Sequence, residues 1–267
     1  MRLTQTHIKF MPVPPILATN KLRKVCFTAV DDRLYYPEGT HIFINSFKKF
    51  HPDIDLVVFR QDTVDKLFPE KNINWYQAKP FFAELLIEKY DLIVNADADH
   101  VVTGRMTEVF DNVDYEVGMP TNLNDYENAS FENITEEMYL QAGMVASTRA
   151  DFWLKWQEMN IDAMRYLRKE NDIVNLLIYN EMPELKLKIF DKEKDYYGCK
   201  ALGREPEFYV ENDKLMCRGE QVRAYHFARG NQFPKLDFEN MPLTDEVRVW
   251  LHKLGYGQSV TIGGVNV

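Results

Sequence analysis

Short apolar runs alternate with amphipathic stretches through the first hundred residues. The apolar runs lie at 24–30, 54–59 and 91–94, and helical periodicity is found at about 38–50, 62–68 and 78–90. This alternation is typical of an α/β fold with a parallel sheet. Ligands of such sheets bind beyond the carboxyl ends of the strands, and Asp31-Asp32 and Asp97-Asp99 stand at such ends.

Two of the predicted helices carry local signals. Asp62 is placed to cap the second helix. Pro80 is expected in the first turn of the third helix, where a missing N–H costs little. The apolar residues of the third helix are expected to share one buried face. They are Phe81, Phe82, Leu85 and Leu86.

The second half of the chain is less regular. We expect an exposed acidic loop at 121–137, strands at 139–147 and 221–227, and helices at 149–158 and about 160–180. Thr244 and Gly255 predict the two ends of a last helix, as its N-cap and the residue past its end. No repeat or linker divides the sequence. We therefore expect a lead-in at 1–23 and one domain at 24–267.

The Asp-x-Asp of VNADADH follows the third apolar run directly. If the backbone stays extended, the side chains of Asp97 and Asp99 leave the same side of the strand. Two such carboxylates repel each other unless a cation lies between them, and oxygen ligands suit Mg²⁺ or Mn²⁺. A cation with open coordination positions can also bind a diphosphate. The motif therefore predicts a metal site for a phosphorylated ligand.

A second chemistry fits the same residues. DADHV also matches the Asp-x-Asp-x-Thr/Val pattern of haloacid-dehalogenase-type phosphatases, with Asp97 as nucleophile and Asp99 as acid/base. Those enzymes place the motif near the N-terminus and need a later acidic pair. Here the motif stands near residue 100 with no Asp-Asp pair after it. The phosphatase is the alternative hypothesis.

An ordered set of segments resembles the family-eight glycosyltransferases of the GT-A fold, the group that includes glycogenin and bacterial galactosyltransferases. The segments are CFTAVDDRLYYPEGTHIFINSF, YQAKPFFAELLIEKYDLIVNADADHVV, YLQAGMVAS, KENDIVNLLI and YHFARG, which together span about 24–235. The resemblance implies a single GT-A, Rossmann-like α/β domain with a mostly parallel central sheet flanked by helices. It also implies transfer of a hexose from a UDP-sugar to an acceptor hydroxyl with retention of configuration.

The resemblance also implies which residues bind the donor. The first strand and the turn after it would hold the nucleotide, and Lys79 would lie near the donor. These nucleotide-binding positions are Thr28, Ala29, Val30 and Tyr36, with the ring of Tyr36 able to stack on the base. By the same resemblance Asp97, Asp99 and a distant histidine, His226, would bind Mn²⁺ or Mg²⁺.

The diphosphate contacts are less well defined. The family has a glycine and a Lys-Pro after the histidine, whereas this chain reads HFARGNQFPK. Gly230 is therefore one position late and Lys235 follows its proline. Either Arg229 or Lys235 is expected to supply the phosphate-binding cation.

Two further segments would face the reacting sugar. Gln141-Ala142-Gly143 resembles the family's Asn-Ser/Ala-Gly turn, in which glycine allows close backbone approach to a ligand. Glu170-Asn171-Asp172 resembles the family's Asp-Gln-Asp/Gly segment. The resemblance therefore implies catalytic roles for Asp172, Glu170 and Gln141, and a donor contact for Gly143.

Composition narrows the partners. The net charge of −9 argues against a surface built to bind nucleic acid. No apolar run approaches the length of a membrane-spanning helix, and no signal peptide is evident. We expect a cytoplasmic protein, with peripheral membrane attachment left open, that uses a nucleotide-sugar donor and an unidentified acceptor. A non-catalytic nucleotide-sugar binder on the same fold is a third hypothesis.

Overall fold

The structure is a computed structural model. It describes residues 22–30, 37–67, 75–121, 134–135, 138–163, 170–190, 196–197, 204–226, 242–255, 261–262 and 265–266. Within these ranges, no helix is long and apolar enough to cross a membrane.

A six-stranded, mostly parallel sheet forms the centre of the fold, in the order β2-β1-β3-β6-β5-β7. Only β6 runs antiparallel to its neighbours in this sheet. The strands are β1 (Lys24–Val30), β2 (Asp55–Arg60), β3 (Leu92–Ala96), β5 (Val117–Pro120), β6 (Met144–Ser147) and β7 (Leu187–Phe190). The parallel α/β arrangement predicted for the first hundred residues is confirmed.

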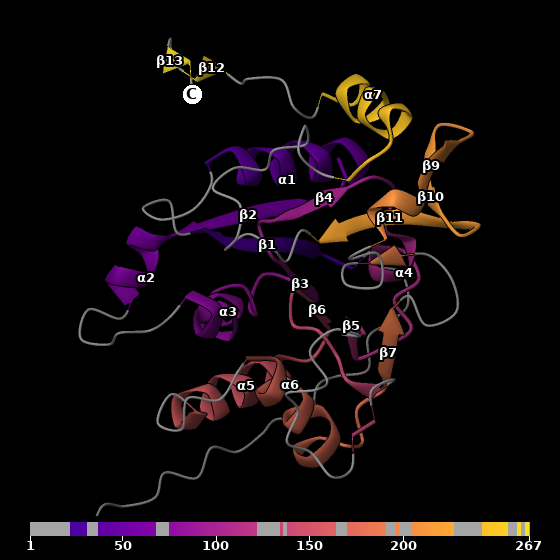
Figure 1. The fold of residues 1–267 in the computed structure, drawn as a ribbon. Helices are drawn as coiled ribbons and strands as arrows, with labels where there is room; N and C mark the ends of the chain where they lie inside the picture. The colour runs from indigo at the N-terminus through magenta and orange to yellow at the C-terminus, as the bar shows by residue number, and fades with distance from the viewer. Residues whose placement is uncertain are drawn as a thin grey trace, which may run out of the picture.

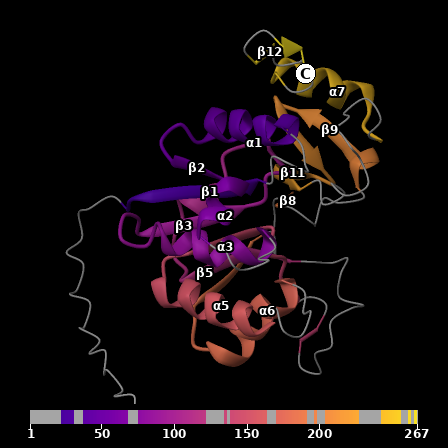
Figure 2. The ribbon, with the colours of Figure 1, turned by 90° about the vertical axis from the view of Figure 1, so that its left-hand side faces the viewer.

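Helices cover both faces of this sheet (Figures 1 and 2). They are α1 (Pro37–Phe50), α2 (Gln61–Leu67), α3 (Trp75–Glu84), α4 (Thr107–Phe110), α5 (Ala150–Ala163) and α6 (Glu170–Leu176), which continues into a π-helical turn at Leu177–Glu181. Alternate residues of β1 face opposite sides, as expected for a strand. Phe27 packs with the core of α3, α5 and α6, while Cys26 packs with that of α1 and α4.

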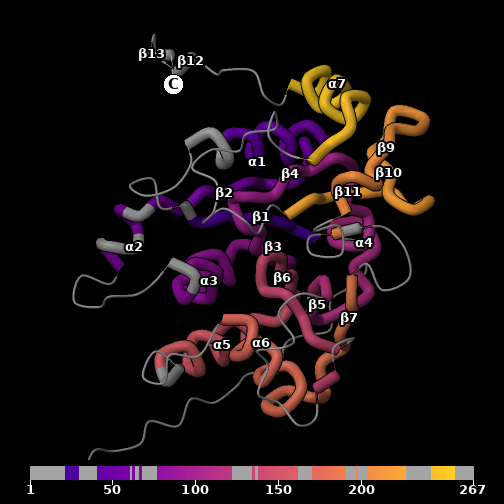
Figure 3. Tube along the Cα trace, in the orientation of Figure 1, coloured from indigo at the N-terminus to yellow at the C-terminus, as the bar shows by residue number. Residues whose placement is uncertain are grey.

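A second, five-stranded sheet lies beside the first and has the order β4-β11-β10-β9, with β8 also paired to β11. Its strands are β4 (His100–Val102), β8 (Tyr196–Tyr197), β9 (Phe208–Glu211), β10 (Lys214–Cys217) and β11 (Glu220–His226). Helix α7 (Asp245–Lys253) packs on this sheet, and a short hairpin, β12 (Thr261–Ile262) and β13 (Val265–Asn266), comes last. The chain passes from the first sheet to the second between β3 and β4, a path that can be followed in Figure 3.

The last helix has the ends expected from the sequence. The Thr244 hydroxyl accepts a hydrogen bond from the N–H of Val247, and Gly255 follows the helix with φ of +90°. Such a φ favours glycine because a Cβ crowds the backbone there.

Three local expectations about helices were wrong. Asp62 lies inside the first turn of α2 and pairs with Lys66, so it is not the cap. Helix α3 begins at Trp75, which places Pro80 in its interior, where it removes one helical hydrogen bond. The helix then ends at Glu84 with a tight turn, and Leu85 is exposed rather than part of the buried face.

The strand predicted at 139–147 is shorter than expected. Only β6 is a strand, and residues 141–143 form a turn before it. Leu140 instead makes an isolated bridge to Thr121. Within the acidic loop at 121–137, the structure describes only Thr121 and residues 134–135, of which Ile134 is buried.

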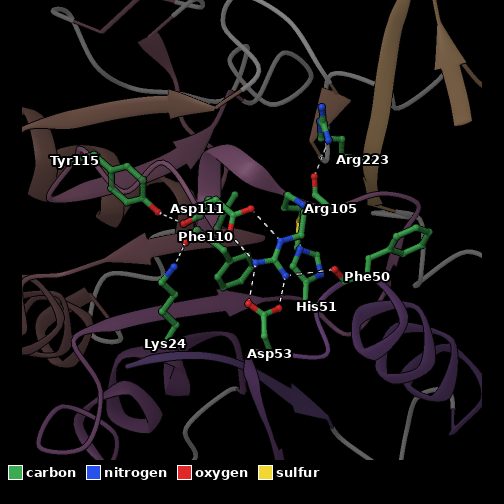
Figure 4. Close-up of polar contacts among 11 residues, drawn as sticks. Lys24, Phe50, His51, Asp53, Arg105, Phe110, Asp111, Tyr115 and Arg223 are labelled. Atoms are coloured by element: carbon green, nitrogen blue, oxygen red, sulfur yellow. Dashed lines mark hydrogen bonds and ion pairs between the residues drawn. The ribbon is translucent and has the colours of Figure 1, made fainter. Parts of the chain in front are cut away.

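A polar network around Arg105 joins the two sheets beside α4 (Figure 4). The guanidinium of Arg105 forms paired contacts with Asp53, after α1, and with Asp111, after α4. The main-chain oxygen of Arg105 accepts a hydrogen bond from Arg223 of β11 at 2.7 Å. Nearby, Nε2 of the buried His51 accepts the N–H of Met106 at 3.0 Å. The segment that follows β4 is thereby held to both halves of the fold.

Stability should fall when the pH is lowered from 7 towards 4, because His51 is buried in its neutral form. Burial, the largest cause, and the charge of Arg105 lower the pKa of His51 to about 4. An unfolded histidine titrates near 6.5, so between these values only the unfolded chain takes up the proton. Stability present above pH 6.5 is thus lost as the pH falls, by about 3 kcal/mol at pH 4.

Urea unfolding of the wild type and of His51→Gln at pH 7 and pH 4.5 tests this. Glutamine keeps an oxygen that can accept the Met106 N–H but does not titrate, so the variant should lose about 2 kcal/mol less between the two pH values. An equal loss in both proteins would show that His51 does not carry the effect.

Candidate active site

The two aspartates of the Asp-x-Asp motif lie in a turn between β3 and β4. The sequence analysis considered an extended backbone, but the backbone forms a turn here. The N–H of His100 donates to the carbonyl of Asp97 at 3.2 Å. The N–H of Asp97 donates to the carbonyl of Gly143 at 2.8 Å. The turn is therefore fixed by its own hydrogen bond and by the segment before β6.

Both carboxylates nevertheless approach one nitrogen atom. His226 ends β11, and its Nε2 lies 3.0 Å from Oδ1 of Asp99 and 3.7 Å from Oδ2 of Asp97. The strand pairing explains this convergence, because His226 is directly opposite His100 in the antiparallel pair of β11 and β4. The three residues predicted to bind a metal are thus brought together.

Lys79 is completely buried beside this group, with its side chain 1% exposed. Its ammonium lies 2.6 Å from Oδ1 of Asp97 and 2.9 Å from Oε1 of Glu170, and it donates to the carbonyl of Ala142 at 3.0 Å. Burial lowers the pKa of Lys79, but the attraction of Asp97 and Glu170 outweighs it and leaves the pKa above its usual value. The lysine is therefore charged and internally paired.

The two carboxyl groups that share Lys79 have raised pKa values. Burial is the main cause for both Asp97 and Glu170, and Lys79 offsets it only in part. The charge of Asp99 also raises the pKa of Asp97, and the charge of Asp97 raises the pKa of Glu170. Lys79 thus favours the charged forms of both acids, but less than their burial disfavours them.

Hydrogen bonds fasten α6 to residues 139–142. Asn171 accepts the N–H of Ala142 at 2.9 Å, and Asn175 forms hydrogen bonds with both the N–H and the carbonyl of Leu140. The hydroxyl of Tyr139 donates to Oδ1 of Asp172 at 2.6 Å. Of the two acids predicted to be catalytic, Glu170 therefore lies against Asp97 through Lys79, while Asp172 is held by Tyr139.

Gly143 stands where no side chain fits. A Cβ at this position would lie 2.4 Å and 2.6 Å from the amide atoms of Gln141 and 2.6 Å from Cε1 of His226. Gln141 and His226 are in direct contact, with Nε2 of the amide 3.0 Å from Nδ1 of the ring. Gly143 thus lies against the chain's own side chains, and its predicted contact with the donor stays a prediction.

The types of donor atom around Nε2 of His226 suit a divalent cation. Oδ2 of Asp97, Oδ1 of Asp99 and Nε2 of His226 offer two carboxylate oxygens and one imidazole nitrogen, a set that suits Mn²⁺ or Mg²⁺. The second oxygen of Asp97 is already bound to Lys79. The chemistry of these donor atoms is therefore compatible with the predicted cation.

Among the described residues, the ligand atoms that lie within 4.8 Å of one another belong to Asp99, His100 and His226, and Asp97 is outside this group. The ring of His100, however, stacks on His226 with centroids 4.2 Å apart and planes only 4° from parallel. Nitrogen lone pairs lie in the ring planes, so those of two parallel stacked rings do not converge on one cation. Nδ1 of His100 lies 2.9 Å from the carbonyl of Asp97, a contact that fits a supporting role.

The positions predicted to bind the nucleotide are only partly described. Thr28 and Ala29 are buried in β1, and Val30 ends that strand opposite Arg60. Phe27 pairs with Asn95, so the end of β1 lies beside the turn that carries Asp97. The remaining candidates lie outside the described residues: Asp31, Asp32, Tyr36, Arg229, Gly230 and Lys235.

Three contributors were missed in the sequence. His100 directly follows the motif and shares a strand pair with His226, but a pairing between residues so far apart in the chain leaves no local signal. Asn175 stands four residues after Asn171, a helical spacing that places both amides on one face. Tyr139 could be connected with Asp172 only through the tertiary structure.

Comparison with known proteins identifies the fold. No model of a known protein family and no curated protein sequence matches the chain. Among solved structures, an active-site mutant of LgtC is similar, with a TM-score of 0.52, 13% identity and coverage of 89% of this chain and 97% of LgtC. The glycosyltransferase GlyE of Streptococcus pneumoniae TIGR4 is also similar, with a TM-score of 0.51 and 12% identity.

This chain spans 60% of the length of GlyE, with 88% of its own residues covered. A second structure, of the galactosyltransferase LgtC with donor and acceptor sugar analogues, gives a TM-score of 0.49 at 14% identity, covering 88% of this chain and 97% of that one. The predicted fold class is confirmed: the chain has the GT-A glycosyltransferase fold.

Removing the Lys79 charge should destabilise the fold strongly. Lys79→Met leaves Asp97 and Glu170 buried without their cation, and breaking a buried pair in this way costs about 3–5 kcal/mol. Glu170→Gln keeps the pair between Lys79 and Asp97 and should cost much less. Chemical denaturation at pH 7 measures both free energies of unfolding. A Lys79→Met loss within 1 kcal/mol of that of Glu170→Gln would contradict the assigned charge state.

Proposed function

We propose that the chain is a metal-dependent glycosyltransferase that moves a hexose from a UDP-sugar to an acceptor hydroxyl with retention of configuration. The observation that carries the proposal is the convergence of Asp97 and Asp99 on Nε2 of His226, just after the carboxyl end of β3, an inner strand of the central sheet of a GT-A fold. This set combines the motif, its placement after a central strand and a distant histidine. It supports membership of the family-eight glycosyltransferases, which the sequence segments resemble.

In this proposal Asp97, Asp99 and His226 hold a Mn²⁺ or Mg²⁺ ion. When bound, the cation would neutralise charge on the departing nucleoside diphosphate. Lys79 orients Asp97 by binding one of its carboxylate oxygens, while the other oxygen faces His226. In this proposal the lysine acts on the metal site, and its predicted position near the donor stays a prediction.

Glu170 is our first candidate for stabilising positive charge at the anomeric carbon. It is the acid of α6 that lies against the Asp97 side chain through Lys79. Asp172, which accepts a hydrogen bond from Tyr139, is the second candidate. Thr28, Ala29, Val30 and Tyr36 are proposed to bind the nucleotide, Gly143 to face the donor sugar, and Gly230 with Lys235 or Arg229 to contact the diphosphate.

The contacts of Asp97 disfavour the phosphatase hypothesis. A nucleophilic Asp97 would need an accessible carboxylate, whereas its side chain is 13% exposed and one oxygen is bound to Lys79. The fold is also that of glycosyltransferases. Phosphatase activity therefore enters only as an outcome of the assay below.

Asp99→Asn should reduce Mn²⁺-dependent release of UDP from UDP-sugars at least roughly 100-fold, because one carboxylate ligand is lost next to the developing charge. The assay is a panel of UDP-sugars with Mn²⁺, scored for UDP release with and without added acceptors. The matched control is Asp114→Asn, which changes an exposed aspartate between α4 and β5. Circular dichroism melting checks that both variants fold.

Full activity of Asp99→Asn would refute the assigned metal site. Hydrolysis of sugar phosphates without any need for a nucleotide would favour the phosphatase. Binding of UDP by the wild type with no turnover of any UDP-sugar would favour the non-catalytic binder.

A further inference from the structure

The ring of His226 is held on its face, on one edge and at Nδ1. Its face stacks on His100, and its Cε1 edge packs at the point where Gly143 leaves room. At the third position Nδ1 faces the side-chain amide of Gln141, which is buried. The orientation of the ring is therefore set before any ligand arrives.

The Gln141 contact determines which ring nitrogen carries the proton. An amide nitrogen can only donate, so in this orientation of the amide Nδ1 accepts from Nε2 of Gln141 at 3.0 Å, which assigns the ring proton to Nε2. That Nε2–H points to Oδ1 of Asp99, 3.0 Å away. In this tautomer the ring nitrogen between the two aspartates has no lone pair to offer a cation.

Gln141 also holds the group needed for the opposite tautomer. Its Oε1 is buried and has no hydrogen-bond partner among the described residues. A half-turn of the amide about its last side-chain bond exchanges Oε1 and Nε2 with almost no change of shape. Oε1 would then accept from a proton on Nδ1, and the lone pair of Nε2 would face Asp97 and Asp99.

We propose that Gln141 is the positioning residue of the metal site and that its amide turns when a cation binds, so that Oε1 fixes the Nδ1–H tautomer of His226. The ring stays neutral in both states: one proton leaves Nε2 and one is taken up at Nδ1. The inference rests on the proposed function, because it concerns the same cation. It assigns to Gln141 an action through His226 instead of a contact with the sugar.

The contact between Gln141 and His226 requires a glycine at position 143. Both amide atoms of Gln141 lie within 2.6 Å of the place where a Cβ of residue 143 would be. Any side chain there would push the amide away from Nδ1. The glycine thus gives Gln141 access to His226.

Two substitutions at Gln141 separate positioning from space filling. Gln141→Leu has similar size but no acceptor, and it should weaken Mn²⁺ binding roughly 10- to 100-fold, the usual effect of losing the partner of a ligating histidine. Gln141→Glu keeps an acceptor oxygen in either protonation state and should bind Mn²⁺ at least as tightly as the wild type. If Gln141 only filled space, Mn²⁺ binding should not differ in this way between the two variants.

The experiment measures Mn²⁺ affinity of the full chain from the paramagnetic resonance signal of free Mn²⁺. Gln221→Leu at the start of β11 is the matched control, and melting curves establish that each variant folds. In parallel, ¹⁵N spectra of the metal-free proteins report the His226 tautomer, assigned by its loss in His226→Gln. The wild type should show the proton on Nε2, and Gln141→Glu should show it on Nδ1.

The possible failures are distinguishable. If the wild type binds no Mn²⁺, the metal site of the proposed function is wrong and this inference with it. If the wild type binds Mn²⁺ and a folded Gln141→Leu binds it equally well, only the role of Gln141 is overturned. Equal losses in folded Gln141→Leu and Gln141→Glu would likewise reduce Gln141 to a packing residue.

Discussion

A buried ammonium group is the interaction on which the rest of the site depends. Lys79 comes from α3, yet it binds Asp97 after β3, Glu170 at the start of α6 and the carbonyl of Ala142 before β6. Removing a charged lysine from water costs several kcal/mol, and such a group persists only when charges and acceptors surround it. These contacts therefore tie four separate parts of the chain together and leave one oxygen of Asp97 facing His226.

The site is assembled where two sheets meet. The central sheet delivers the Asp-x-Asp turn, and the second sheet delivers His226 through the pairing of β11 with β4. The Arg105 network secures the segment after β4 from the other side, through Asp53, Asp111 and Arg223. The placement of the donor atoms thus follows from backbone pairing and from ion pairs that hold the neighbouring segments.

Patterns with a strong local cause could be predicted from the sequence. The apolar runs that became β1, β2 and β3 and the capped last helix are of this kind. The starts of α2 and α3 could not be predicted. Both helices begin before Asp62 and Pro80, and helix propensity does not reveal this. The burial of Lys79 was also out of reach, since its partners stand 18 and 91 residues further along the sequence.

Asp97 and Asp99 approach one nitrogen atom although their backbone forms a turn and not the extended strand considered from the sequence. The location of His226 on the second sheet has one more consequence. A ligand held jointly by Asp97, Asp99 and His226 would bind only while the two sheets are docked, so its binding free energy would add to their cohesion. Binding of this ligand would then make the interface between the two sheets harder to open, even in a variant without catalytic activity.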